Sequence, residues 1–145
     1  MDALSIFFTV SSIVTIAIAA YGAIKMNRRN LLLGTFLFSL IPVMGESSQF
    51  YLTGDYGNLL TIVAFLCAAI ISFPSKITYD SKNIAAVHLA RKIALSIIVL
   101  NSLQGYIILQ LRTDIPAQYG YAHLALALIF VYMIVKSKNS DFKMN

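Results

Sequence analysis

The chain has 145 residues, of which 59% are hydrophobic and 12% are charged, and its mean hydropathy is +0.78. A soluble domain needs more charge on its surface, so this composition excludes soluble enzymes and soluble binding modules and predicts an all-α integral membrane protein. The formal net charge of +5 does not indicate nucleic-acid binding, because the basic residues fall at the ends of apolar runs and form no basic patch.

The first apolar run covers residues 3–24 and carries no charged side chain. At about 1.5 Å per residue, a run of this length crosses about 30 Å of hydrocarbon, so we predict a transmembrane helix. No basic segment precedes it, so we interpret it as a retained span and not as a signal peptide. Small side chains recur at every fourth position and predict a face that lets another helix approach closely. These residues are Ser11, Thr15, Ala19 and Ala23.

The second predicted span, residues 31–52, contains Glu46, the only acidic side chain well inside an apolar run. An unpaired carboxylate is costly at membrane depth, so Glu46 marks either a functional site or a buried polar contact. Pro42 lacks an amide hydrogen and predicts a helix kink, as in the broken helices of transporters, although many membrane prolines are only structural. Spacings of three and four place the polar residues of this run on the face of Pro42. They are Thr35, Ser39, Glu46 and Gln49.

The third predicted span covers residues 59–78 and is interrupted by Pro74. It reaches the length needed to cross the membrane only if residues 75–78 continue it, so a re-entrant segment is the alternative. Cys67, in this run, is the single cysteine of the chain. It leaves neither an internal disulfide nor a cysteine-based metal cage available.

The fourth predicted span, residues 88–111, begins with three side chains that carry or can carry a positive charge: His88, Arg91 and Lys92. Long basic side chains at a membrane edge extend toward the headgroups. We therefore predict that these residues contact lipid headgroups, and docking of a cytoplasmic partner is the alternative.

The fifth predicted span, residues 119–135, completes a single integral-membrane domain that covers residues 1–145. With the amino terminus outside, ten of the eleven Lys and Arg residues fall on the cytoplasmic side and only Arg112 lies outside. Basic residues in short loops favour the cytoplasmic side. We therefore predict five transmembrane helices, an outer N-terminus and a cytoplasmic C-terminus, in the plasma membrane of a prokaryote.

Polar residues of three predicted spans lie at a similar height, in the outer third of the membrane. The helix rise puts Glu46 and Gln104 each about 20 Å above the cytoplasmic end of their helices. One interpretation is a pocket or proton-handling site in which Glu46 and His123 titrate. The other is that these groups hydrogen-bond between helices and only stabilise the bundle. The predicted layer comprises Glu46, Gln49, Asn101, Gln104, Tyr106 and His123.

No cofactor is assigned from the sequence. His88 and His123 are predicted about 20 Å apart in height, so they cannot ligate one haem iron within a chain. A metal site at Glu46 and His123 has no supporting ligand spacing. Because the chain also contains no Gly-rich phosphate loop, nucleophile elbow or HExxH motif, we predict no catalytic activity.

Short loops, absent catalytic motifs and the small-residue face of the first span together favour an accessory subunit of a larger membrane complex. The alternative is a small homo-oligomeric transporter or channel in which Glu46 on the kinked second helix lines the path. A membrane enzyme that acts on a lipid or quinone near His123 is a third hypothesis. The predicted partners are the bilayer and other membrane subunits or copies of the chain, with no nucleic acid.

Overall fold

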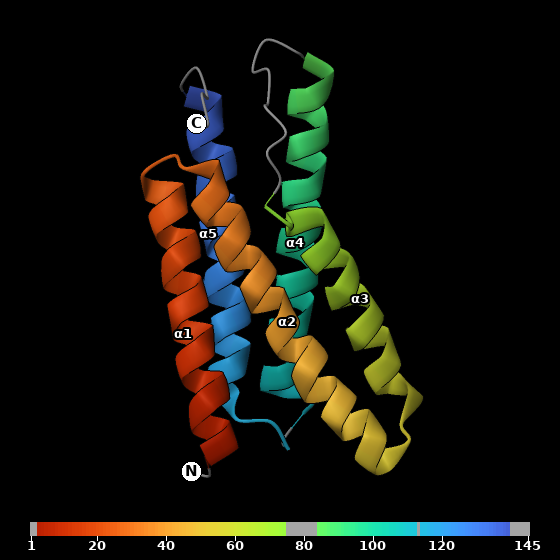
Figure 1. Ribbon diagram of the computed structural model, residues 1–145. Helices are drawn as coiled ribbons and strands as arrows, with labels where there is room; N and C mark the ends of the chain where they lie inside the picture. Colours follow the sequence, from red (N-terminus) through yellow and green to blue (C-terminus); the bar gives the residue numbers. More distant parts are fainter. Residues whose placement is uncertain (1–2, 75–83, 113, 140–145) are drawn as a thin grey trace.

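The computed structural model describes residues 3–74, 84–112 and 114–139, and within these ranges the chain folds into five α-helices (Figure 1). Four of the described helices contain a segment long and apolar enough to cross a membrane, which confirms the predicted all-helical class and agrees with a membrane protein. The helices are α1 (Ala3–Ile24), α2 (Arg28–Thr53), α3 (Tyr56–Ser72), α4 (Ile84–Gln110) and α5 (Ala117–Asn139).

α3 is shorter than the span predicted for this part of the chain. It ends at Ser72, and Phe73 adopts an extended conformation (φ −56°, ψ 123°), because a residue that precedes proline disfavours helical angles. At about 1.5 Å per residue, its 17 residues cover about 26 Å, which is less than the hydrocarbon thickness of about 30 Å. Residues 75–78, which the predicted span included, lie outside the described residues.

α1 and α2 form an antiparallel pair that packs with its backbones very close together. A Cβ added at Gly34 would collide with the backbone of Thr15 and Ala19, so only a glycine allows this approach. Thr15, Ala19 and Ala23, three residues of the small-residue face predicted on α1, are buried. The face thus packs against α2 of the same chain.

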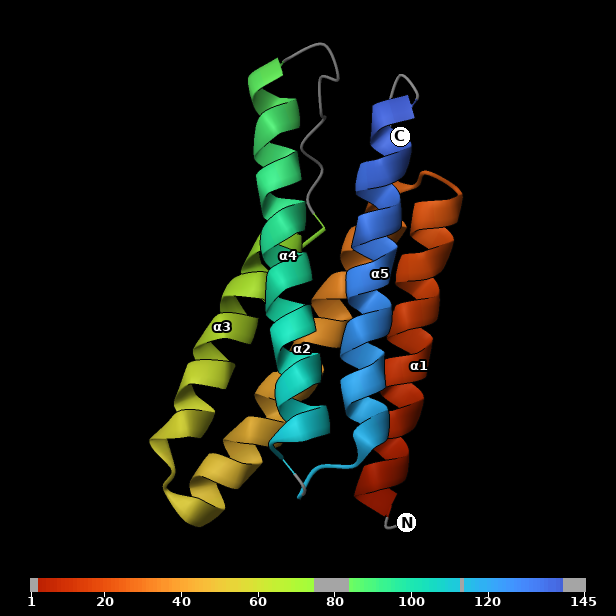
Figure 2. The ribbon, with the colours of Figure 1, turned by 180° about the vertical axis from the view of Figure 1, so that it is seen from behind.

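The five helices divide into two packed groups. α2 packs on α1 and α3, while α4 and α5 pack on each other through Gly105 and Gly120, and α5 also packs along α1 (Figures 1 and 2). In Figure 1, the second half of α2 leans away from α1 and toward α3. α2 therefore crosses in front of the α4–α5 pair without packing closely along either helix.

The two ends of the bundle differ in the connections that they carry. The start of α1, the α2–α3 turn and the α4–α5 connection lie at one end, which we call the N-terminal end (Figure 1). Here α2 stops at Gly54, whose φ of 68° is left-handed, and the Asp55 carboxylate accepts a hydrogen bond of 2.8 Å from the amide of Gly57 to cap α3. The α1–α2 turn, the start of α4 and the end of α5 lie at the opposite end.

Candidate functional site

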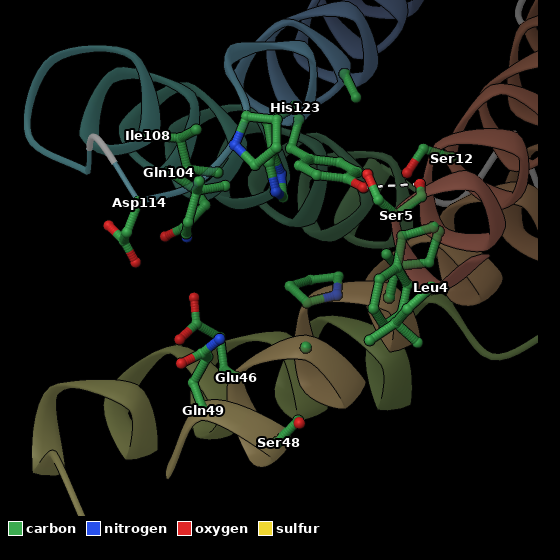
Figure 3. A pocket seen from close by; sticks show the side chains of 18 of the residues that line it. Leu4, Ser5, Ser12, Glu46, Ser48, Gln49, Gln104, Ile108, Asp114 and His123 are labelled. Atoms are coloured by element: carbon green, nitrogen blue, oxygen red, sulfur yellow. Dashed lines mark hydrogen bonds between the residues drawn. The ribbon is translucent and has the colours of Figure 1, made fainter. Parts of the chain in front are cut away.

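A cavity of about 510 Å³ lies between α2 and the helices α1, α4 and α5 near the N-terminal end (Figure 3). Its wall is built by the first half of α1, the second half of α2, the end of α4, the α4–α5 connection and the start of α5. Most of the lining is apolar, as in typical small-molecule sites, and a few polar groups converge on it. The polar residues include Ser12, Glu46, Ser48, Gln49, Gln104 and His123.

Pro42 lies in the cavity wall, and α2 continues through it as a single helix. Proline has no amide hydrogen, so the carbonyl of Phe38 one turn earlier loses its helical donor. The part of α2 that follows Pro42 carries Glu46 and Gln49 toward the N-terminal end. Pro42 is thus part of the cavity wall, and a functional role for the predicted kink stays a prediction.

Glu46 is the most deeply buried carboxylate of the described residues, with 5% of its surface exposed. Its Oε1 lies 3.8 Å from Nη1 of Arg112, which is an ion pair but is too long for a hydrogen bond. Its Oε2 is buried and has no hydrogen-bond partner within the described part of the chain. Native structures rarely leave a buried polar atom without a hydrogen bond, so the unpaired Oε2 of Glu46 needs a physical explanation.

Arg112 directs its guanidinium mainly toward Asp114. Nε lies 2.9 Å from Oδ1 and Nη2 lies 2.9 Å from Oδ2, so the pair is bidentate. This hydrogen bonding lowers the pKa of the Asp114 carboxyl below its ordinary value and raises the pKa of Arg112. Because the guanidinium is committed to Asp114, Glu46 receives only the longer contact.

His123 is held on the opposite wall by a hydrogen bond and by two aromatic rings. Nδ1 lies 2.8 Å from Oδ1 of Asn101, whose Nδ2 donates to the carbonyl of Ile97 at 2.9 Å. Oδ1 can only accept, so Nδ1 carries the proton and Nε2 is the acceptor of the neutral ring. The rings of Phe38 and Phe65 lie with their centroids 5.0 and 5.2 Å from that of His123.

The structure brings four members of the predicted polar layer to one cavity and leaves two outside it. Glu46, Gln49, Gln104 and His123 line the cavity, and Figure 3 shows Glu46 and Gln104 facing each other across it. Asn101 is buried behind His123, whereas 58% of the surface of Tyr106 is exposed, away from the lining. No hydrogen bond or ion pair joins Glu46 to His123 in the described ranges.

His88, Arg91 and Lys92 lie on the first part of α4, at the end opposite to the cavity. His88 and Lys92 are exposed, while Arg91 is half-buried and its Nε has no hydrogen-bond partner among the described residues. These three residues contribute nothing to the cavity wall. Contact with headgroups or with a partner remains a prediction for them.

Several residues at the site were not singled out by the sequence. Arg112 was noted only as the one basic residue on the outer side, yet it pairs with both Asp114 and Glu46. Tyr119 carries no sequence signal for a site, yet its hydroxyl donates to the carbonyl of Ser5 at 3.1 Å and links α5 to α1. The nearest sequence signal was the Arg-x-Asp spacing in a short connection, which permits a local ion pair.

Within the described residues, no group of three or more His, Cys, Asp or Glu side chains is placed to hold a metal ion. The chain matches no family model, no curated protein and no solved structure.

Proposed function

We propose that this chain is a small homo-oligomeric transporter or channel whose solute path includes the cavity beside Glu46. The observation that carries this proposal is the buried carboxylate of Glu46, which faces a cavity and has one oxygen without a hydrogen-bond partner among the residues that the structure describes. A buried charge is retained only when it is paired or functional, because its desolvation is costly. A passing or bound solute would supply the missing partner.

We further propose that the chain spans the cytoplasmic membrane of a prokaryote five times, with its N-terminus outside. The positions of the basic residues support this orientation. Lys25, Arg28 and Arg29 lie at the α1–α2 turn, and Arg91 and Lys92 lie near the start of α4, all toward the end opposite to the cavity. Such clusters favour the cytoplasmic side, so the cavity would open toward the outer half of the membrane.

Reconstitution into vesicles tests the transport function. Solid-supported membrane electrophysiology records charge movement when the external solution is exchanged for sodium, potassium, ammonium, small organic cations or matched anions. We expect a current for at least one of these solutes, and its loss in Glu46→Gln. The absence of a current for every solute would contradict the transport function. A current that persists unchanged in Glu46→Gln would show that the carboxylate has no part in transport.

An accessory subunit of a larger membrane complex is the second candidate function. It is supported by α3, which is apolar and exposes Leu60 (76%) and Ile70 (74%) but is shorter than the hydrocarbon thickness. Short apolar helices are accommodated by bilayer thinning or by association with other chains. Purification of the native assembly in mild detergent tests this candidate. A chain that elutes without any other protein would contradict it.

A further inference from the structure

We propose that the ligand of the cavity is an organic cation with an ammonium head and an apolar, ring-sized body. This inference rests on the proposed function and names the solute class that the same site would accept. Three features of the cavity support it: the sign of its charged groups, the grouping of its carboxylate and amide side chains beside apolar ones, and its size.

The charged side chains in the lining are of one sign. Glu46 and Asp114 are the two carboxylates, and no Lys or Arg contributes to the described wall. Arg112 lies next to the site, but its guanidinium forms a bidentate pair with Asp114 and reaches Glu46 only at 3.8 Å. Two carboxylates thus share one guanidinium, so an anion would meet net negative charge, whereas a cation would find an acceptor at Glu46.

The carboxylate and amide side chains of the lining gather in one part of the cavity. Figure 3 shows Glu46 and Gln49 on one side, facing Gln104 on the other. An ammonium group has three donors and no acceptor, so a carboxylate and two amide oxygens match its hydrogen-bonding needs. Among the described residues no donor pairs with Oε2 of Glu46, so this oxygen is one acceptor that a ligand could use.

Much of the remaining wall is apolar and includes Phe8, Phe38 and Ile41. These apolar side chains provide no oxygen ligands for a small inorganic cation, which needs several around it. They do favour an aromatic or aliphatic body, whose burial contributes about 25 cal/mol per Å² of apolar surface. The volume of about 510 Å³ lies within the range of about 300 to 1,000 Å³ that is typical of sites for drug-sized ligands.

Three probes of similar shape and different charge test the inference. Isothermal titration calorimetry on the purified chain in detergent would compare 2-phenylethylammonium, 3-phenylpropionate and 2-phenylethanol. We expect the ammonium probe to bind about tenfold or more tightly than the other two. Equal or tighter binding of 3-phenylpropionate would overturn the proposed ligand class.

Substitutions at two acidic positions locate the interaction. Glu46→Gln is expected to weaken the binding of the ammonium probe by about tenfold or more and to leave the affinity for 2-phenylethanol unchanged, because only the charge is removed. Asp55→Asn is the matched control, since Asp55 lies at the same end of the bundle and outside the lining, and Asn also caps helices. Unchanged ammonium binding in Glu46→Gln would contradict the inference.

Glu46→Asp keeps the charge on a shorter side chain and should retain a measurable preference for the ammonium probe over the alcohol. If Glu46→Gln does not purify as a single species, the comparison of the three probes on the unmodified chain still decides the ligand class. Ammonium binding without any current supports this class and contradicts transport. A Glu46-dependent current without ammonium binding overturns the class and supports transport.

Discussion

At the scale of single residues, the site depends on how one guanidinium is shared between two carboxylates. Arg112 binds Asp114 at two points at hydrogen-bond distance and approaches Glu46 only at 3.8 Å. The Asp114 pair is at the surface, where solvent screens its energy, while Glu46 is buried. The buried carboxylate of Glu46, whose desolvation costs more, therefore has the weaker contact with Arg112. Stability alone would favour the opposite arrangement.

The Arg112–Asp114 pair should make the stability of the chain depend on pH. Because Arg112 lowers the pKa of Asp114 in the folded chain, the pair contributes stability above the unfolded pKa of about 3.9. That contribution is lost as the pH falls through the lower folded value. Titration of a ¹³C-labelled Asp114 carboxyl by NMR should show the lowered pKa, and Arg112→Gln should return it toward the ordinary value. A pKa that does not move in Arg112→Gln would contradict this assignment.

Asn101 is predicted to stabilise the bundle through His123. Asn101→Leu would leave the buried Nδ1–H of His123 without its acceptor and should reduce the free energy of unfolding by about 1 to 2 kcal/mol. Thermal unfolding in detergent measures this change. Ser96→Ala, at an exposed position on the same helix, is the control. A double variant with His123→Leu should recover part of the loss, and additive effects of the two substitutions would argue against the contact.

At the scale of the elements, the two halves of α2 pack differently. The first half lies close against the backbone of α1, whereas the second half diverges from α1 and leaves room for the cavity. Gly34 lies against α1 in the first half, whereas a Cβ added at Gly45 in the second half would meet no atom within 4 Å. Pro42 lies between the two glycines. The cavity therefore begins where α2 stops packing on α1.

The two glycines allow the same substitution to be compared within one helix. Gly34→Ala should destabilise the chain by about 1 to 3 kcal/mol, because the added methyl group collides with the α1 backbone. Gly45→Ala should stabilise it by about 0.5 to 1 kcal/mol, because alanine restricts the unfolded chain and meets open space. Unfolding midpoints in detergent provide the comparison. Equal effects at both positions would contradict the described packing.

At the scale of the whole molecule, the charges separate between the two ends of the bundle. Glu46, Asp55 and Asp114 lie toward the N-terminal end, where Arg112 is the only described basic residue. The clusters beginning at Lys25 and Arg91 lie toward the other end. Such an asymmetry favours one orientation of a protein in a membrane, and it places two carboxylates, Glu46 and Asp114, in the cavity lining.

Cysteine labelling tests the orientation in intact cells. In a Cys67→Ala background, Asp55→Cys at the α2–α3 turn should react with a membrane-impermeant maleimide added outside. Asn27→Cys at the α1–α2 turn should react only after the membrane is permeabilised. The reverse pattern would contradict the proposed topology and would place the mouth of the cavity on the cytoplasmic side.

The sequence alone determined the all-helical class and the presence of helices apolar enough to cross a membrane, because long apolar runs bounded by charge have few other stable forms in water or lipid. It also singled out Glu46 and Pro42, because a carboxylate and an imino acid are rare inside such runs and stand out without any coordinates. Periodicity further identified the small-residue face of α1, although it could not say which helix covers that face.

Only the tertiary structure decided which polar residues meet. Equal height along helices placed Tyr106 and Gln104 in the same layer, but the rotation of α4 buries Gln104 in the cavity wall and exposes Tyr106. The rotation of a helix about its axis depends on packing between helices that are distant in the sequence, so local sequence patterns do not determine it. For the same reason, the Phe38 and Phe65 contacts of His123 and the sharing of Arg112 emerged only once the helices were assembled.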